Sequence, residues 1–257
     1  MHASDRAQLD LADATAVARV VADLQPGLIV NCAADNDVDG CEDHPVSALA
    51  VNALGVRALA RAAREAGSTF VHYSSDFVFD GETSRPYVED DPPSPRSVYA
   101  SSKLLGEWFA ADVPRHYVLR VESLFGPSPP GSRTRRGSLG TIVDRIRGGE
   151  VVPVFIDRTV SPSFTPDVAS ATRRLVETNA SPGLYHCVNQ GMATWIEIAE
   201  EIARRSGVEL QARPLTLETV TMKARRPRFC ALSPARLAAA GIAMPSWQDA
   251  LARYLTL

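Results

Sequence analysis

The chain lacks the features that mark several classes of protein. No run of apolar residues approaches the length of about 20 that a helix needs to span a bilayer. The first residues, MHASDR, contain no apolar core of a signal peptide. Positive and negative charges nearly cancel, with a net charge of −3, so the composition favours neither nucleic acid nor a membrane surface as a partner. What remains is a globular protein whose 257 residues can bury a sizeable core.

Cysteine is scarce as well. The four cysteines have neither the spacing of metal ligands nor the density of a disulfide framework. The histidines are not paired with carboxylates or cysteines at ligand spacing either. We therefore predict reduced thiols, no metal centre and a cytoplasmic protein. The cysteines are Cys32, Cys41, Cys187 and Cys230.

A glycine-rich phosphate-binding turn is also missing. Neither G-x-G-x-x-G nor G-x-x-G-x-x-G occurs anywhere in the chain. In dinucleotide-binding folds such a turn lets the backbone approach the pyrophosphate at the N-terminus of a helix. The 257 residues by themselves are therefore expected to bind a dinucleotide poorly.

What is present is an alternation of apolar strands and amphipathic helices. Asp13 is a suitable N-cap for a first helix, and an alanine-rich helix from Pro45 to Ala66 ends at Gly67. A further helix is expected from Ile196 to Arg205. This alternation of strands and helices predicts a doubly wound parallel sheet. The expected strands are residues 28–32, 69–73, 117–121, 151–155 and 183–187.

The most informative stretch begins where the second of these strands ends. Ser75 and Asp76 follow the strand, and a loop rich in proline and aspartate leads to Tyr99-x-x-x-Lys103 in a helical segment. A spacing of four places Tyr99 and Lys103 on one helix face. A nearby ammonium lowers the pKa of a phenol, and Ser75 could hold a carbonyl group for protonation by Tyr99. The same spacing also arises by chance, with a core tyrosine and a solvated lysine.

Ordered motifs surround this stretch. They include SSDFVFDG at 74–81, YASSK at 99–103, NCAA at 31–34 and SPSFTPD at 161–167. Together they resemble the extended short-chain dehydrogenase/reductases, in the dTDP-4-dehydrorhamnose reductase branch. The similarity runs from about Asp10 to Leu255, so it does not depend on one short match.

The resemblance implies a fold and a reaction. The fold is α/β, with an N-terminally truncated Rossmann-like cofactor domain at 1–125 and a smaller, mainly substrate-binding domain at 126–257. Residues of about 157–180 are candidates to return to the first domain. The reaction is reduction of the 4-keto group of a nucleotide-linked deoxysugar by NADPH or NADH. A homodimer is the candidate assembly.

The resemblance also assigns roles to residues. Tyr99 would protonate the carbonyl oxygen, Lys103 would lower the pKa of Tyr99 and hold the nicotinamide ribose, and Ser75 would orient the carbonyl. Asp76 and Ser123 occupy substrate positions. The cofactor positions are Asp10 and Leu11 by the adenine, and Ala34, Asp35 and Asn36 along the middle of the cofactor.

The largest departure from this family lies at the N-terminus. Roughly 30 residues are absent, which is the size of a βαβ unit without its final strand. The first strand of such a sheet is central, so its loss should leave strand edges and an apolar face exposed. A start codon assigned too late, a truncated paralogue and a redesigned N-terminus are the three explanations. We favour the first, because the catalytic stretch is intact.

A second departure concerns the substrate. Ser123 stands where the family has a tryptophan, and a carboxylate, Glu122, arrives beside it. This change leaves the identity of the sugar open. The loop at 128–140 is expected on the substrate side, where its arginines would either meet an anionic substrate or form a solvated basic loop. These are Arg133, Arg135 and Arg136.

Two other functions stay open. One is a non-catalytic nucleotide-binding or regulatory subunit of the same fold, which suits a chain without a phosphate-binding turn. Such a subunit does not require Ser75, Tyr99 and Lys103 together. The other is a nucleotide-sugar epimerase, which the change at Ser123 permits.

Overall fold

A sheet of parallel strands forms the centre of the protein, whose computed structural model describes residues 2–127 and 137–257. The strand order is β1 (Leu28–Asn31), β2 (Thr69–Ser75), β3 (His116–Val121), β8 (Gly183–His186). The register places Val71 opposite both Val30 and Tyr117. These strands and β5 (Val152–Phe155) confirm the predicted strands to within two residues at each end. The predicted parallel α/β sheet is confirmed.

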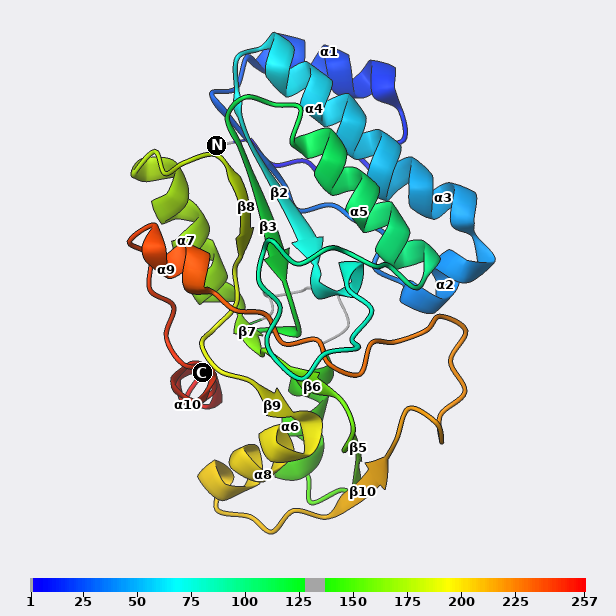
Figure 1. The fold of residues 1–257 in the computed structure, drawn as a ribbon, viewed down its shortest axis with the longest axis vertical. Helices are drawn as coiled ribbons and strands as arrows, with labels where there is room; N and C mark the ends of the chain where they lie inside the picture. Colours follow the sequence, from blue (N-terminus) through cyan, green and yellow to red (C-terminus); the bar gives the residue numbers. More distant parts are fainter. Residues whose placement is uncertain (1, 128–136) are drawn as a thin grey trace.

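Helices cover both faces of this sheet (Figure 1). On one face, α1 (Ala14–Leu24), α4 (Val56–Glu65) and α5 (Val98–Ala110) pack over Phe70 and Val118. On the other, α7 (Thr165–Glu177) and α9 (Ala235–Ala239) pack over Val71 and Leu119. Neighbouring residues of a strand point to opposite faces. The continuous apolar runs of β2 and β3 are therefore the sequence expected of strands buried on both sides.

The alanine-rich helix has three parts. It begins as α3 (Pro45–Leu49), continues through a π-helical segment, η1 (Ala50–Gly55), and ends as α4. By length and composition alone, residues 45–65 could cross a membrane. The expectation that no segment reaches that length is therefore wrong. Half of this segment's most apolar window is buried inside the protein, as in the core helix of an α/β domain.

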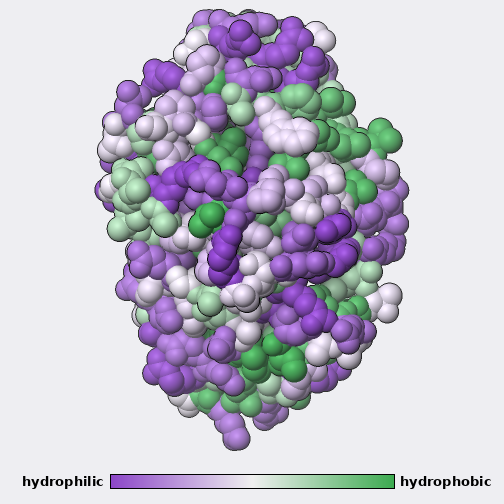
Figure 2. Space-filling model, in the orientation of Figure 1, coloured by the Kyte–Doolittle hydropathy of each residue, from purple (hydrophilic) through white to green (hydrophobic). Residues whose placement is uncertain are grey.

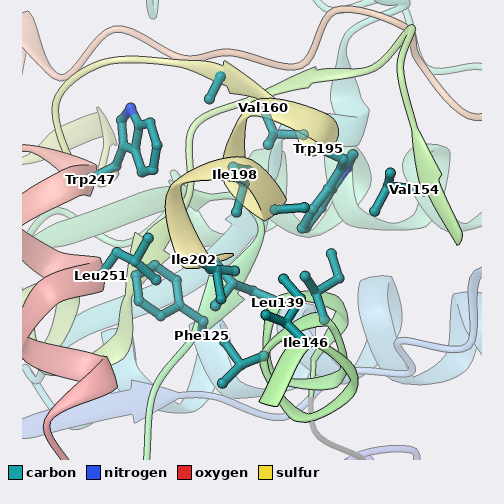
Figure 3. Packing of buried hydrophobic residues seen from close by; sticks show 14 of the residues in the cluster. Phe125, Leu139, Ile146, Val154, Val160, Trp195, Ile198, Ile202, Trp247 and Leu251 are labelled. Atoms are coloured by element: carbon teal, nitrogen blue, oxygen red, sulfur yellow. The ribbon is translucent and has the colours of Figure 1, made fainter. Parts of the chain in front are cut away.

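A second core lies below the sheet. It joins α6 (Ser138–Arg147), α8 (Trp195–Ser206) and α10 (Trp247–Leu255) to β5. Figure 3 shows its side chains interdigitating, with Ile198 and Ile202 of α8 between Trp247 and Leu139. Helix α8 begins with a capping box between Thr194 and Glu197. Three short strand pairs complete this region: β10 (Ala212–Leu215) with β5, β4 (Leu124–Phe125) with β7 (Ser163–Phe164), and β6 (Thr159–Val160) with β9 (Ala193–Thr194).

Strand β1 forms one edge of the central sheet. Its outer side pairs with no strand in the part of the chain that the structure describes. Two of its side chains are correspondingly open to solvent, with Leu28 40% and Val30 44% exposed. The expected exposure of a strand edge is therefore present at β1. The face of the molecule seen in Figure 2 is mostly hydrophilic, and its apolar residues gather in small groups.

Candidate active site

All the predicted site residues except Asp10 and Leu11 lie at or beside one edge of the sheet. Ser75 ends β2, Glu122 follows the end of β3, and the loop containing Asn36 follows β1. Because these strands are parallel, their carboxyl ends meet at the same edge, which is where ligands bind in open α/β sheets. Helix α5 runs beside this edge and carries Tyr99 and Lys103.

Tyr99 and Lys103 are both buried on α5. The helix begins at the N-cap Ser97, whose hydroxyl accepts the Ala100 N–H at 3.1 Å. The Tyr99 hydroxyl donates to Asn36 Oδ1 at 3.4 Å. The Lys103 ammonium donates to the backbone carbonyl of Tyr73, at 2.6 Å. The predicted shared helix face is confirmed, and it places both groups against the carboxyl end of β2.

The electrostatics of Tyr99 differ from the prediction. Burial raises the pKa of the Tyr99 phenol above its usual value, and the hydroxyl of Ser75 lowers this pKa by less. Burial also lowers the pKa of Lys103 to about 8, against the charge of Glu107. Any lowering of the phenol pKa by Lys103 is outweighed here, because burial dominates and the ammonium is held on the Tyr73 carbonyl. Tyr99 is therefore protonated at neutral pH.

The two predicted substrate residues have different surroundings. Asp76 begins the short helix η2 (Asp76–Val78) and is buried, with Oδ1 accepting the Ser75 hydroxyl at 2.9 Å. Ser123 is half-buried and adopts a left-handed conformation, with φ +43°. This left-handed turn precedes β4. A tryptophan at this position would also adopt a strained backbone conformation. Substrate contact by either residue stays a prediction.

The middle of the predicted cofactor site is held by a residue to which the sequence analysis assigned no role. Asn52, fully buried in η1, accepts the Asp35 N–H at 2.8 Å and donates to the Asp35 carbonyl at 2.9 Å. Its amide also donates to Ser102 on α5 at 3.0 Å. Asn52 thus fixes the loop of Ala34, Asp35 and Asn36 beside the Tyr99 helix. A lone amide in an apolar helical pattern was the available signal.

The other predicted cofactor residues, Asp10 and Leu11, lie in a separate turn. Asp10 is exposed and its carboxylate accepts the Ala12 N–H at 3.0 Å. Leu11 packs so closely on Gly55 that a Cβ at that glycine would lie 2.9 Å from the Leu11 Cβ. No hydrogen bond given for the described residues joins this turn to Tyr99 or Lys103. The predicted basic residues Arg133, Arg135 and Arg136 lie outside the described residues.

A buried ion pair, also missed by the sequence analysis, fixes α5 on the sheet. Arg120 of β3 makes two bonds to Glu107 of α5, at 2.8 and 2.7 Å. The Ser74 hydroxyl donates to the same carboxylate at 2.6 Å. Such a fully bonded pair fixes one arrangement of its elements. An arginine inside the apolar strand sequence HYVLRV was the signal for it.

The fold and the site together define a class. A parallel Rossmann-like sheet with serine, tyrosine and lysine at its carboxyl edge is the arrangement of the short-chain dehydrogenase/reductases, as the sequence motifs indicated. A family model described as the RmlD substrate binding domain matches residues 1–257, and the chain belongs to this family.

Proteins that are similar in sequence or structure agree with this family. A dTDP-4-dehydrorhamnose reductase from Streptomyces griseus is 35% identical over 254 residues, covering 96% of this chain and 82% of that protein. A protein of the same name from Mycobacterium tuberculosis is 32% identical, covering 99% of this chain and 84% of its own. The crystal structure of a dTDP-4-dehydrorhamnose reductase from Bacillus anthracis in complex with NADP has a TM-score of 0.91 at 28% identity, covering 99% and 89%.

Proposed function

We propose that the chain is an NAD(P)H-dependent reductase of a nucleotide-linked 4-keto-deoxysugar, of the dTDP-4-dehydrorhamnose reductase type. The observation that carries the proposal is the placement of the Tyr99 phenol by Ser75 and Asn36, with Lys103 one helical turn further on, at the carboxyl edge of the sheet. The relatives named above support the substrate class. The cytoplasm is the compartment that we propose.

The residues present suit one half of the cofactor. Ala33 is exposed and Ala34 half-buried at the end of β1, next to Asn36, so a ring and its ribose can approach the backbone there. Lys103 offers donors for ribose hydroxyls. NADPH or NADH would supply the hydride when bound, and the Bacillus anthracis relative holds NADP. A homodimer remains the assembly that we propose.

The chemistry assigned to this chain is proton transfer. Burial keeps Tyr99 protonated at neutral pH, so it can give its proton to the carbonyl oxygen as negative charge develops there. Ser75, whose hydroxyl is held by its bond to Asp76, contacts the carbonyl group and orients it. Lys103 then faces the phenolate that forms, and its positive charge stabilises that phenolate.

The test is the substitution Tyr99→Phe, which removes the phenolic proton and keeps the ring. We expect the rate of ketone reduction to fall by about 10²–10⁴-fold, the usual contribution of a general acid, with cofactor binding nearly unchanged. The assay measures NADPH and NADH oxidation with a dTDP-linked 4-keto-6-deoxysugar. Any in-frame coding sequence upstream of Met1 is included in the expressed protein.

Tyr117→Phe is the matched control. Its hydroxyl donates to the Ala180 carbonyl at 2.7 Å, away from the site, so this variant should lose a little stability and keep its rate. Activity of Tyr99→Phe within a few-fold of the parent would remove Tyr99 from the mechanism. Cofactor binding with no reduction by the parent protein would instead favour the regulatory-subunit alternative.

A further inference from the structure

Behind Ser75 lies a group of ionisable side chains that the proposed reaction does not use. Asp76 is 4% exposed, Glu122 3% and Cys230 1%. One potential ligand atom from each lies within 4.8 Å of the others. The half-buried Arg158 extends toward them, and its Nη2 lies 3.6 Å from the Cys230 sulfur.

The two carboxyl groups are each only half satisfied. Asp76 Oδ1 accepts the Ser75 hydroxyl at 2.9 Å, and Glu122 Oε2 accepts the Ser161 N–H at 2.6 Å. The remaining oxygens, Asp76 Oδ2 and Glu122 Oε1, are buried and have no hydrogen-bond partner among the described residues. Buried polar atoms are nearly always paired. The two carboxyl groups therefore require a group that both can share.

The two carboxyl groups approach closely, with one oxygen of each within 4.8 Å of the other. A proton on Glu122 Oε1 would turn that carboxyl group into a donor toward Asp76. It also balances the charge, because one carboxylate then faces the one guanidinium of Arg158. A divalent cation would balance the charge only if the Cys230 thiol were ionised as well, and burial raises the pKa of that thiol. The charge balance therefore favours a proton over a metal ion.

We propose that Asp76 and Glu122 share one proton, carried by Glu122 at neutral pH, and that Glu122 thereby acts as a positioning residue for the Ser75 hydroxyl. The second half of this proposal rests on the proposed function. Ser75 donates to Asp76, so an Asp76 carboxylate held by Glu122 fixes the direction of the hydroxyl. With both carboxyl groups charged, their repulsion would move Asp76 and release Ser75.

The titration behaviour of the cluster supports this arrangement. Burial raises the pKa of Glu122 well above its usual value, with the Asp76 charge adding to it and the Ser161 N–H and Arg158 opposing it. Burial raises the pKa of Asp76 to about 6, against the Ser75 hydroxyl, Arg158 and the Cys230 thiol. Burial also raises the pKa of the Cys230 thiol. From α5, Tyr99 faces the Asp76 charge and is neutral.

The first test compares wild type with Glu122→Gln, whose amide keeps the shape and the donor but cannot titrate. Folded wild type keeps a proton that the unfolded chain has lost between pH 6.5 and 8. Its unfolding constant should therefore rise about tenfold per pH unit more steeply than that of the variant. Denaturant unfolding at several pH values measures both. Parallel curves would overturn the shared proton.

Glu107→Gln is the matched control. It places the same substitution in a buried carboxyl group that is paired with Arg120, so stability should fall at every pH without the change in slope. Should Glu122→Gln not fold, infrared spectroscopy of wild type at pH 7.5 decides instead. A protonated-carboxyl band is expected there, and its absence would overturn the proposal.

Binding of a metal ion is tested first on the wild-type protein. After dialysis against zinc or manganese and then buffer, elemental analysis should find no stoichiometric metal. One ion per chain, lost in Glu122→Gln, would assign the cluster to a metal ion and overturn the proton.

The positioning role is tested by ketone reduction. Glu122→Leu, which lacks the donor, should lower kcat at least tenfold with little change in KM, and Glu122→Gln should restore part of that loss. Equal losses in both variants would make Glu122 merely structural. If wild type itself reduces no ketone, the proposed function fails, while the unfolding curves still decide the shared proton.

Discussion

Lys103 shows at the residue scale how a functional group acts against stability. Its ammonium is buried, and burial lowers its pKa to about 8 from the ordinary 10.5. Among the described residues, a hydrogen bond to the Tyr73 carbonyl and the charge of Glu107 compensate in part for the water that it has lost. Folded proteins commonly keep such destabilising groups where their activity needs them.

Substituting Lys103→Met should therefore change stability and binding in opposite directions. Below pH 8 the folded protein must hold a buried charge, and above about 10.5 neither state is charged. Wild-type stability thus rises with pH between these values, relative to the variant. We expect a higher melting temperature for Lys103→Met at pH 7, a gain that shrinks by pH 10, and weaker cofactor binding.

Thermal unfolding at several pH values and a cofactor titration measure these effects. Lys223→Met is the control, because that lysine is exposed and pairs only with Asp43 and its neighbours. A variant whose cofactor affinity equals that of wild type would remove Lys103 from the binding site.

Sequence reasoning predicted the roles of some site residues and missed the roles of others for a physical reason. Ser75, Tyr99 and Lys103 carry their chemistry in local patterns: a strand end and a helical spacing. Asn52 and Glu122 depend on partners 17 and 39 residues away, Asp35 and Ser161. Nothing local in the sequence fixes such partners, because tertiary packing alone brings them together. The prediction of a lowered pKa for Tyr99 was wrong for the same reason, because the burial of a side chain is not known before the fold is.

At the scale of elements, long apolar strands could be predicted and short ones could not. Each of the strands β1, β2, β3, β5 and β8 is at least four residues long, which is enough to give an apolar run in the sequence. The two-residue strands β6, β7 and β9 have no pattern of their own and exist only through their partners. The π-helical turn of η1 was also unpredicted, and such turns often mark functional positions.

Close contact between η1 and α5 makes Gly106 a sensitive position. A Cβ there would lie 2.5 Å from the Asn52 carbonyl oxygen and 3.1 Å from His72 Nε2. Gly106→Ala should therefore push α5 away from η1 and cost about 1–3 kcal/mol in the free energy of unfolding. It should also weaken cofactor binding, because Asn52 holds the Asp35 loop. Urea unfolding and a cofactor titration measure both.

Gly27→Ala provides the comparison, since a Cβ at that position meets nothing within 4 Å. Its free energy of unfolding should stay within about 0.5 kcal/mol of wild type. Equal stability of Gly106→Ala and Gly27→Ala would show that α5 can shift without cost.

At the scale of the whole molecule, the unpaired outer side of β1 in the described residues predicts association of the 257-residue chain. Strand β1 presents unpaired backbone groups together with the exposed Leu28 and Val30. Native proteins usually block such edges with charge, because an open edge pairs with another chain. We expect a chain of these 257 residues to self-associate as its concentration rises.

Val30→Lys tests this expectation by placing a charge on the edge. Sedimentation velocity over a range of concentrations should show less association than in wild type. The isosteric Val30→Thr serves as control and should associate nearly as wild type does. Association that is unchanged in Val30→Lys would place the interface elsewhere.

The absence of a glycine-rich turn from the 257 residues bears on cofactor affinity. The 257-residue chain offers Asn36, Tyr99 and Lys103 to the nicotinamide half of a dinucleotide, yet its sequence holds no glycine-rich turn for the pyrophosphate. In dinucleotide-binding folds that turn and the helix after it supply the backbone N–H donors and partial positive charge for the phosphates. Without them, the surviving contacts should hold NADPH or NADH poorly. Calorimetric titration of the purified 257-residue chain measures this directly. Micromolar affinity would mean that other residues of this chain bind the phosphates, and the arginines of the Ala224–Arg228 segment would be the first to substitute.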